Sequence, residues 1–169
     1  MARAVALDPA DGTPGSRALR GRVLLVSSTG GVFLDLLALA PWWRRHDRVW
    51  ALVRGGDTAS ALEGEVITWI TNSSYKRPLA LLRGCVEARR ILRAQRPAII
   101  VSAGSGPAIP FFALARLFGI PTLWLSTLNL VGRAGVSARI CSRLASRVLV
   151  QRPSMLAAHS KAVLLGELY

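Results

Sequence analysis

The chain has 169 residues, of which 51% are hydrophobic, so it can bury the core of one domain and its composition excludes wholesale disorder. Its mean hydropathy of +0.38 is high for a freely soluble protein and indicates both a large core and apolar surface that meets a partner or a membrane. The formal net charge is +13, from 22 basic and 9 acidic residues.

Arginine supplies nearly all of the positive charge, because the only lysines are Lys76 and Lys161. The guanidinium group presents a planar fork of donors that suits phosphate groups. A basic surface of this kind fits nucleic acid, anionic lipid head groups or a phosphate-bearing substrate. A general arginine bias on a solvated face is the alternative, and composition alone does not separate these.

Neither a targeting segment nor a metal site is expected. Residues 1–20 carry acids, glycine and proline without an apolar segment, which predicts a flexible leader and no signal peptide. The most apolar region, Pro97–Gly132, is broken by prolines, so we expect no membrane-spanning helix. Cys85 and Cys141 are isolated and are expected to be buried free thiols, which fits a reducing cytoplasmic setting with no metal and no cofactor.

From Arg22 onward, short apolar runs alternate with longer helical patterns. In chain order the expected strands are Val23–Ser27, Arg48–Val53, Val66–Ile70, Ala98–Val101, Thr122–Leu125 and Val148–Val150, with a further apolar run at Ala162–Leu165. The expected helical segments are Phe33–Leu39, Asp57–Leu62 capped by Asp57, Leu79–Gln95, Ala108–Phe118, Ser137–Ala145 and Ser154–Ala158.

The segment Leu79–Gln95 is the clearest helix, because Leu81, Cys85, Ala88 and Leu92 recur at helical spacing as one apolar stripe. Strands that alternate with helices predict an α/β fold, a Rossmann-like and mostly parallel sheet with helices on both faces. The strands are continuous apolar runs, as expected where both faces are covered. We therefore expect a single domain over residues 21–169.

Two glycine-rich turns follow expected strands and open expected helices. The first is Ser27-Ser28-Thr29-Gly30-Gly31, and the second is Ser102-Ala103-Gly104-Ser105-Gly106-Pro107. Ligands of open parallel sheets bind beyond the carboxyl ends of the strands, and the free amides at a helix start favour a phosphate. Both turns are therefore candidate phosphate-binding sites, and tight loops that packing alone requires are the alternative for each.

Three segments together resemble one family. They are LLVSSTGG at Leu24–Gly31, PAIIVSAGSGPAIPFFALARLFGIPTLWL at Pro97–Leu125, and SRVLVQRPSM at Ser146–Met155. In order and spacing they are similar to the oligosaccharide-biosynthesis family of asparagine-linked glycosylation protein fourteen, which includes bacterial capsule and exopolysaccharide subunits. The resemblance extends over nearly the whole folded part of the chain.

This resemblance implies the amino-terminal half of a GT-B glycosyltransferase, similar to an N-acetylglucosaminyltransferase. Such a subunit binds a lipid-linked pyrophosphate acceptor peripherally on the cytoplasmic face of the membrane, in lipid-linked oligosaccharide or exopolysaccharide biosynthesis. It holds a second, carboxyl-half subunit that carries the UDP-sugar site, and without that partner it is expected to be inactive. By this resemblance the residues facing the acceptor pyrophosphate are Ser28, Thr29, Gly30, Gly31, Gly104, Ser105 and Gly106.

The chain departs from the family pattern at two positions. Val32 stands where the family's first turn commonly has histidine, and Ser126 stands where the strand ending at Leu125 usually runs into an acidic residue. Asp35 is then the nearest acid to the first turn and the only candidate for a catalytic group, although a charge that stabilises the amino end of a helix is the stronger interpretation. His46 and His159 are expected at the surface.

Two other functions remain as alternatives: a basic nucleic-acid-binding α/β domain and a stand-alone small-molecule Rossmann enzyme. The first would need aromatic residues interleaved with the arginines, and the second an acid after the second strand, where Asp57 lies. For peripheral membrane contact the expected surface is the helical region Phe111–Phe118, including Arg116.

Overall fold

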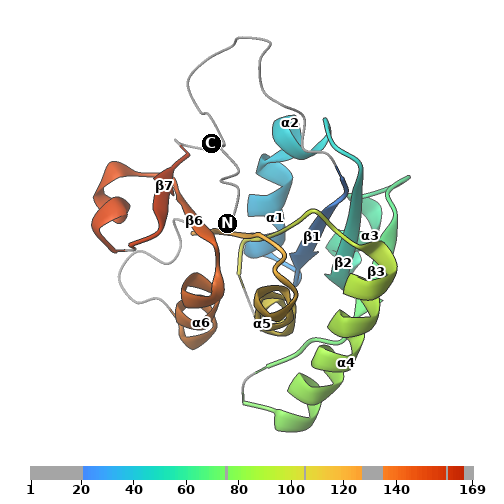
Figure 1. The fold of residues 1–169 in the computed structure, drawn as a ribbon. Coiled ribbons are helices and arrows are strands. Elements are labelled where there is room, and N and C mark those ends of the chain that lie inside the picture. Colours follow the sequence, from blue (N-terminus) through green and yellow to red (C-terminus); the bar gives the residue numbers. More distant parts are fainter. Residues whose placement is uncertain (1–20, 75, 105, 127–134, 159, 166–169) are drawn as a thin grey trace.

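The computed structural model describes residues 21–74, 76–104, 106–126, 135–158 and 160–165, and the expected leader lies outside these ranges. Within them, all strands form one parallel sheet in the order β3-β2-β1-β4-β5-β6-β7 (Figure 1). The strands are β1 (Val23–Ser27), β2 (Arg48–Val53), β3 (Ile67–Ile70), β4 (Ile99–Ser102), β5 (Thr122–Leu125), β6 (Arg147–Val150) and β7 (Ala162–Leu164).

Helices connect the strands and cover both faces of the sheet, as expected from the sequence (Figure 1). The helices are α1 (Gly31–Ala38), α2 (Ala40–Trp43), α3 (Gly56–Ser60), α4 (Pro78–Gln95), α5 (Ala108–Phe118), α6 (Val136–Leu144) and the 3₁₀ helix η2 (Pro153–Ala158). This Rossmann-like architecture confirms the predicted fold class.

Alternate residues of each strand enter two separate cores. On one face, Leu24 and Val26 of β1 pack with residues of α4, α5 and α6. On the other face, Val23 and Leu25 pack with α1 and α2, where Trp50 meets two other aromatic rings edge-on. Successive side chains of a strand point to opposite faces, so continuous apolar runs are needed to fill both cores.

Helix α4 ends at an unusual residue. Arg96 follows its last turn in the left-handed conformation, with φ of 43°, and its amide donates to the carbonyl of Leu92. Pro97 then prevents the helix from continuing. Of the inward stripe predicted for this helix, Ala88 and Leu92 are buried, while Leu81 and Cys85 are only partly buried.

The structure corrects three details of the predicted elements. Ala162–Leu164 forms a seventh strand at the edge of the sheet, and the apolar region after β1 contains the additional short helix α2. Helix α3 begins at Gly56 after Gly55, so the prediction that Asp57 caps it is wrong. The Thr58 hydroxyl instead accepts a hydrogen bond from the Gly55 amide at 3.1 Å.

Candidate functional site

The two glycine turns lie at the same edge of the sheet. β1 and β4 are adjacent parallel strands, with Leu25 opposite Val101, and each glycine turn follows the carboxyl end of one of them. The sequence prediction that both turns meet at the carboxyl edge is therefore confirmed. This edge is the usual place for a ligand in an open parallel sheet.

The first turn is open to solvent. Thr29, Gly30 and Gly31 are exposed, and Ser28 is partly exposed. Gly30 has φ of 78°, a left-handed conformation that favours glycine, and a Cβ built on it would meet no atom within 4 Å. Its carbonyl accepts the amide of Phe33 at 2.9 Å, which begins α1. The first amides of a helix have no acceptor within the helix, so this turn can present them to an anion.

The second turn is packed more tightly. Gly104 is buried with φ of 112°, and its amide donates to the Ser102 hydroxyl at 3.2 Å. A Cβ on Gly106 would overlap the carbonyl oxygen of Ser73. Packing thus gives a reason for glycine at both described positions, while Ser105 lies outside the described residues.

The side chains beside the turns offer little acid–base chemistry. Asp35 is 4% exposed within α1, so it is poorly placed to contact a bulky acceptor. Val32 is partly buried and packs against the core on the α1 face. Ser126, directly after β5, is buried, and its amide donates to the carbonyl of Leu149.

Buried polar side chains lie where neighbouring strands end, and sequence reasoning did not recognise them as one group. Ser27, Ser102, Ser126 and Gln151 terminate or directly follow β1, β4, β5 and β6, and all four are buried. In the part of the chain that the structure describes, neither the Ser27 hydroxyl nor the side-chain amide group of Gln151 has a hydrogen-bond partner. A polar residue directly after each apolar run was the signal that could have identified this group.

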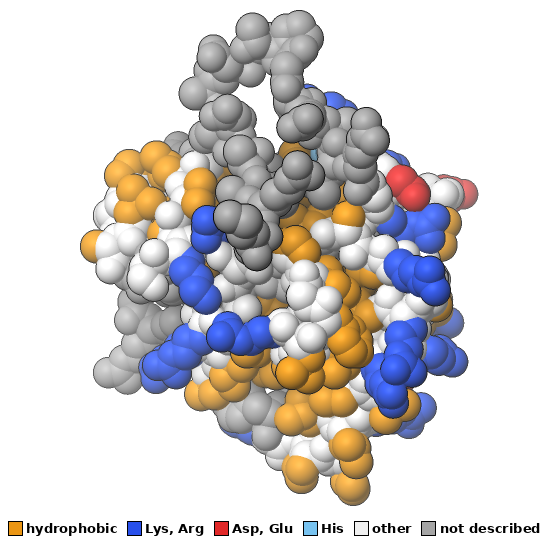
Figure 2. All heavy atoms as spheres, viewed as in Figure 1, with side chains coloured by type: hydrophobic (Ala, Val, Ile, Leu, Met, Phe, Trp, Pro, Cys, Tyr) orange, Lys and Arg blue, Asp and Glu red, His pale blue; other side chains and the backbone are white. Residues whose placement is uncertain are grey.

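A second missed feature lies on the outer side of α4. Leu79, Leu82 and Val86 follow one another at helical spacing and are 82%, 63% and 65% exposed. Figure 2 shows hydrophobic side chains at the lower end of the molecule, where α4 begins in Figure 1, with basic side chains beside them. We call these three side chains the α4 stripe. The exposed basic residues of the same region are Lys76, Arg77, Arg83, Arg89, Arg90 and Arg93.

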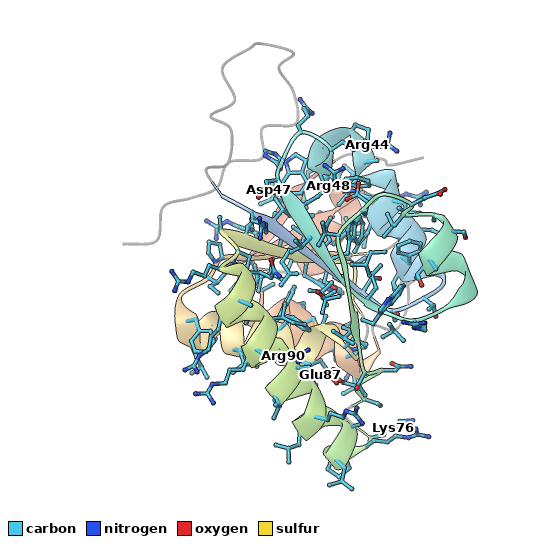
Figure 3. The ribbon with its side chains drawn as sticks, turned by 90° about the vertical axis from the view of Figure 1, so that its right-hand side faces the viewer. Arg44, Asp47, Arg48, Lys76, Glu87 and Arg90 are labelled. Atoms are coloured by element: carbon cyan, nitrogen blue, oxygen red, sulfur yellow. The ribbon has the colours of Figure 1, made fainter. Side chains whose placement is uncertain are left out.

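Figure 3 shows Lys76 near the start of α4 and Arg90 farther along the helix, with Arg44 and Arg48 at the opposite end of the molecule. The positive charge around the α4 stripe is thus separate from the arginines beside β2. An exposed apolar stripe with flanking bases is typical of a surface that meets a membrane or a partner.

The region expected to meet a membrane, Phe111–Phe118, is mostly unsuited to that role. Phe111 and Phe112 are buried in the core, and only the end of α5 exposes apolar side chains, at Leu117 and Phe118. Because α5 lies against both α4 and α6, its amphipathic pattern reflects packing between helices. Within the described ranges, no helix is long and apolar enough to cross a membrane.

Metal ligands do not gather anywhere in the described part of the chain, where no group of three or more His, Cys, Asp or Glu side chains could hold an ion. Cys141 is buried, and this burial raises the pKa of its thiol to about 12. Cys85 is partly exposed, so the expectation of burial holds for Cys141 alone. His46 is partly exposed, and burial together with the charge of Arg45 lowers its pKa.

Comparison with known proteins points to one kind of transferase. No protein-family model matches the chain. The chain is 32% identical over 157 residues to the UDP-N-acetylglucosamine–N-acetylmuramyl-(pentapeptide) pyrophosphoryl-undecaprenol N-acetylglucosamine transferase of Methylococcus capsulatus, covering 85% of this chain and 44% of that protein. It is 29% identical over 160 residues to the protein of the same name from Nitrosospira multiformis, covering 85% and 43%. The chain thus spans a little under half the length of these relatives.

Solved structures agree on the fold. MurG of Acinetobacter baumannii matches with a TM-score of 0.68 at 22% identity, over 86% of this chain and 45% of that one. The UDP-GlcNAc 2-epimerase of Methanocaldococcus jannaschii matches with a TM-score of 0.66 at 10% identity, over 86% and 45%. The chain therefore has the fold of the amino-terminal half of a GT-B glycosyltransferase, and its homologues are transferases of the MurG type.

Proposed function

We propose that this chain is the acceptor-binding half of a UDP-sugar glycosyltransferase. In this role it binds a lipid-linked pyrophosphate acceptor at a membrane surface, and a separate carboxyl-half chain supplies the UDP-sugar. The observation that carries the acceptor-binding role is the 32% identity, over 157 residues, to a transferase whose name specifies a pyrophosphoryl-undecaprenol acceptor. Lipid-linked oligosaccharide or exopolysaccharide biosynthesis, as in the family of asparagine-linked glycosylation protein fourteen, is the process that we propose.

The acceptor pyrophosphate would bind at the carboxyl edge, beside the two glycine turns. The first turn supports this assignment best, because Gly30 and Gly31 are exposed and open α1. Helix amides and the partial positive charge of a helix start stabilise phosphate oxygens without any side chain. Gly104 and Gly106 would form the adjoining wall, with Ser28 and Thr29 as hydroxyl donors, and we propose Ser105 as a further acceptor-binding residue from the sequence alone.

Proton transfer would come from outside these turns. Asp35 is the candidate acid beside the first turn, but it is 4% exposed, and Val32 has no ionisable group. A general base typically contributes 10²–10⁴-fold to a rate. We therefore propose that the partner chain or the substrate supplies this group, and that the isolated chain binds an acceptor without transferring sugar.

Peripheral attachment to the cytoplasmic face of a membrane would use the α4 stripe. Exposed leucine and valine side chains enter the boundary between head groups and acyl chains, and each basic residue near an anionic surface contributes about 1 kcal/mol. The apolar side chains and the arginines lie on the same helix, so both contributions act at one place.

A reconstitution tests the proposed function. The chain and a candidate carboxyl-half partner are purified separately and mixed with vesicles that contain an undecaprenyl-pyrophosphoryl sugar and labelled UDP-N-acetylglucosamine. We expect labelled lipid from the mixture alone, and co-purification of the two chains. Transfer by the isolated chain, or micromolar binding of the UDP-sugar to it, would contradict the proposed division of labour.

A further inference from the structure

Ser73, in the loop that follows β3, lies between two glycines. Ser73 is 2% exposed, and a Cβ on Gly84 of α4 would overlap its hydroxyl oxygen. A Cβ on Gly106 of the second glycine turn would overlap its carbonyl oxygen. Ser73 therefore fills a notch whose two walls are α4 and the candidate phosphate-binding edge.

Glu87 of α4 holds this loop in place. Its carboxylate accepts hydrogen bonds from the amide of Thr71 at 2.8 Å and from the hydroxyl of Thr71 at 2.7 Å. Arg83 lies one turn earlier on α4, with its Nε 3.3 Å from the same carboxylate. The Ser73 amide in turn donates to the Thr71 carbonyl at 2.8 Å. Hydrogen bonds to a charged acceptor are about twice as strong as neutral ones, so the loop is fixed to the helix.

The other end of the loop leads directly into the α4 stripe. Arg77 immediately precedes α4, and its carbonyl accepts the amide of Leu81. Leu79 and Leu82 lie in the first turns of α4, after the loop that contains Ser73, and both are strongly exposed. A short, hydrogen-bonded loop therefore joins the proposed membrane surface to the glycine turn at the sheet edge.

We propose that Ser73 is a positioning residue that couples the seating of α4 on a membrane to the geometry of the second glycine turn. The inference rests on the proposed function, because it concerns the same acceptor site. Close-packed contacts pass on displacement since they leave no free volume to absorb it. Because residues 84 and 106 are glycines, Ser73 packs directly against the backbone of α4 and of the second glycine turn. A shift of α4 would therefore move Ser73, and Ser73 would move the turn.

Such coupling is reciprocal, and its size is measurable. If membrane binding tightens the binding of an anion by some factor, the anion tightens membrane binding by the same factor. Couplings between sites in proteins are typically about 5–150-fold. We expect vesicles to tighten pyrophosphate binding to the full chain by at least about 5-fold.

The experiment measures inorganic pyrophosphate binding by calorimetry, with and without vesicles of phosphatidylglycerol and phosphatidylcholine. The ratio of the two dissociation constants is compared between variants in the same vesicles, so that the charge of the lipid acts equally on all. In Gly84→Ala the new methyl group displaces Ser73, and we expect the ratio to fall to about 1. Gly56→Ala is the matched control in α3, because a Cβ there meets nothing within 4 Å, and it should keep the wild-type ratio.

A rescue separates positioning from loss of stability. Adding Ser73→Ala to Gly84→Ala removes the hydroxyl oxygen that the new methyl group meets, and we expect much of the ratio to return. Glu87→Gln keeps the shape of the side chain but removes the charge that holds Thr71, so it should lower the ratio without touching the notch. It serves as the test if Gly84→Ala does not fold, which melting curves would reveal.

The outcomes distinguish the inference from the proposed function. If the wild-type chain binds both vesicles and pyrophosphate but the ratio is 1, the coupling is wrong while the acceptor site stands. If Gly84→Ala or Glu87→Gln keeps the full wild-type ratio, Ser73 has no positioning role. If the wild-type chain binds neither pyrophosphate nor vesicles, the proposed function and the coupling both fail.

Discussion

A Cβ on Gly104 would lie 3.1 Å from the indole nitrogen of Trp124, a side chain that is itself 1% exposed. The second glycine turn is therefore built against the core of the sheet. Gly30 of the first turn shares the positive φ, but a Cβ there would meet no atom within 4 Å. The two turns lie at the same edge of the sheet, but only the first has space for a side chain at its positive-φ glycine.

Alanine substitution should destabilise each glycine position according to its backbone conformation and to the atoms that the new methyl group meets. Gly104→Ala combines a left-handed backbone with contact against buried Trp124, and we expect it to lower the free energy of unfolding by about 2–3 kcal/mol. Gly30→Ala meets only the backbone cost, about 1–2 kcal/mol. Gly56→Ala, which has neither cost, should change stability by less than about 0.5 kcal/mol. Urea unfolding followed by tryptophan fluorescence measures all three, and an equal loss in Gly104→Ala and Gly30→Ala would contradict the role of Trp124.

Glu65 stabilises the amino end of β2 through two partners. It accepts hydrogen bonds from the Nε of Arg48 at 2.9 Å and from the indole nitrogen of buried Trp50 at 3.2 Å. Glu65→Ala would leave both donors without this acceptor, and we expect a loss of about 1–3 kcal/mol. Asp47→Ala is the control, because its ion pair with Arg22 is exposed and should contribute at most about 1 kcal/mol. Equal midpoints of urea unfolding for the two variants would show that Glu65 contributes no more than a surface ion pair.

The strands could be predicted from the sequence because each is a continuous apolar run between turn-forming residues. The structure moves no predicted strand of the first six by more than one residue at either end. The run at Ala162–Leu164 is only three residues long, so its pairing depends on β6 and is not visible in its own pattern. Helix α2 was missed because its tryptophans continue the apolar region of α1.

The candidate site was only half predictable. Local sequence places glycines after β1 and β4, and the order of the strands brings the turns to one edge. The contacts behind them join residues far apart in the chain, such as Ser73 with Gly106, so no local pattern reports them. The α4 stripe was overlooked for another reason: its spacing is helical like that of the inward stripe, and only burial shows which of the two faces the core.

Glu87 should make the stability depend on pH. Partial burial alone would raise the pKa of its carboxyl, but the hydrogen bonds from Thr71 and the charge of Arg83 outweigh this effect and lower the pKa from the ordinary value of 4.5. The charged form is then favoured in the folded state, so its contribution to stability is present above pH 4.5 and is lost as pH falls through the lowered folded pKa.

Urea unfolding curves recorded from neutral pH to below pH 4.5 check the direction of the pKa shift of Glu87. The difference in unfolding free energy between the wild type and Glu87→Gln should be largest near neutral pH and shrink in acid. Thr71→Val, which removes one of the two donors, should reduce this pH dependence. A difference that grows as pH falls below 4.5 would mean that the folded state favours the protonated carboxyl instead.

Val32 is the position where a single change could add function. The side chain is partly exposed at the start of α1 and packs against the core on that face. An imidazole ring can keep its polar edge in solvent from a partly exposed position, so we expect Val32→His to fold with little change in melting temperature. Its protonated form would place a positive charge beside the amides of the first turn. Pyrophosphate binding should therefore tighten as pH falls through the ordinary histidine pKa of about 6.5.

The control is Val32→Asn, which is polar but does not titrate, so its pyrophosphate affinity should not show the same pH-dependent gain. In the assembled pair of chains, a histidine that reaches the acceptor hydroxyl as a general base would raise transfer, within the usual 10²–10⁴-fold range of such groups. If Val32→His instead buries its ring without a hydrogen-bond partner, the free energy of unfolding falls by about 1–3 kcal/mol. The melting temperature then falls as well, and pyrophosphate binding is unchanged. That result would make position 32 a core position. It would also show that a side chain at this position cannot assist anion binding at the first turn.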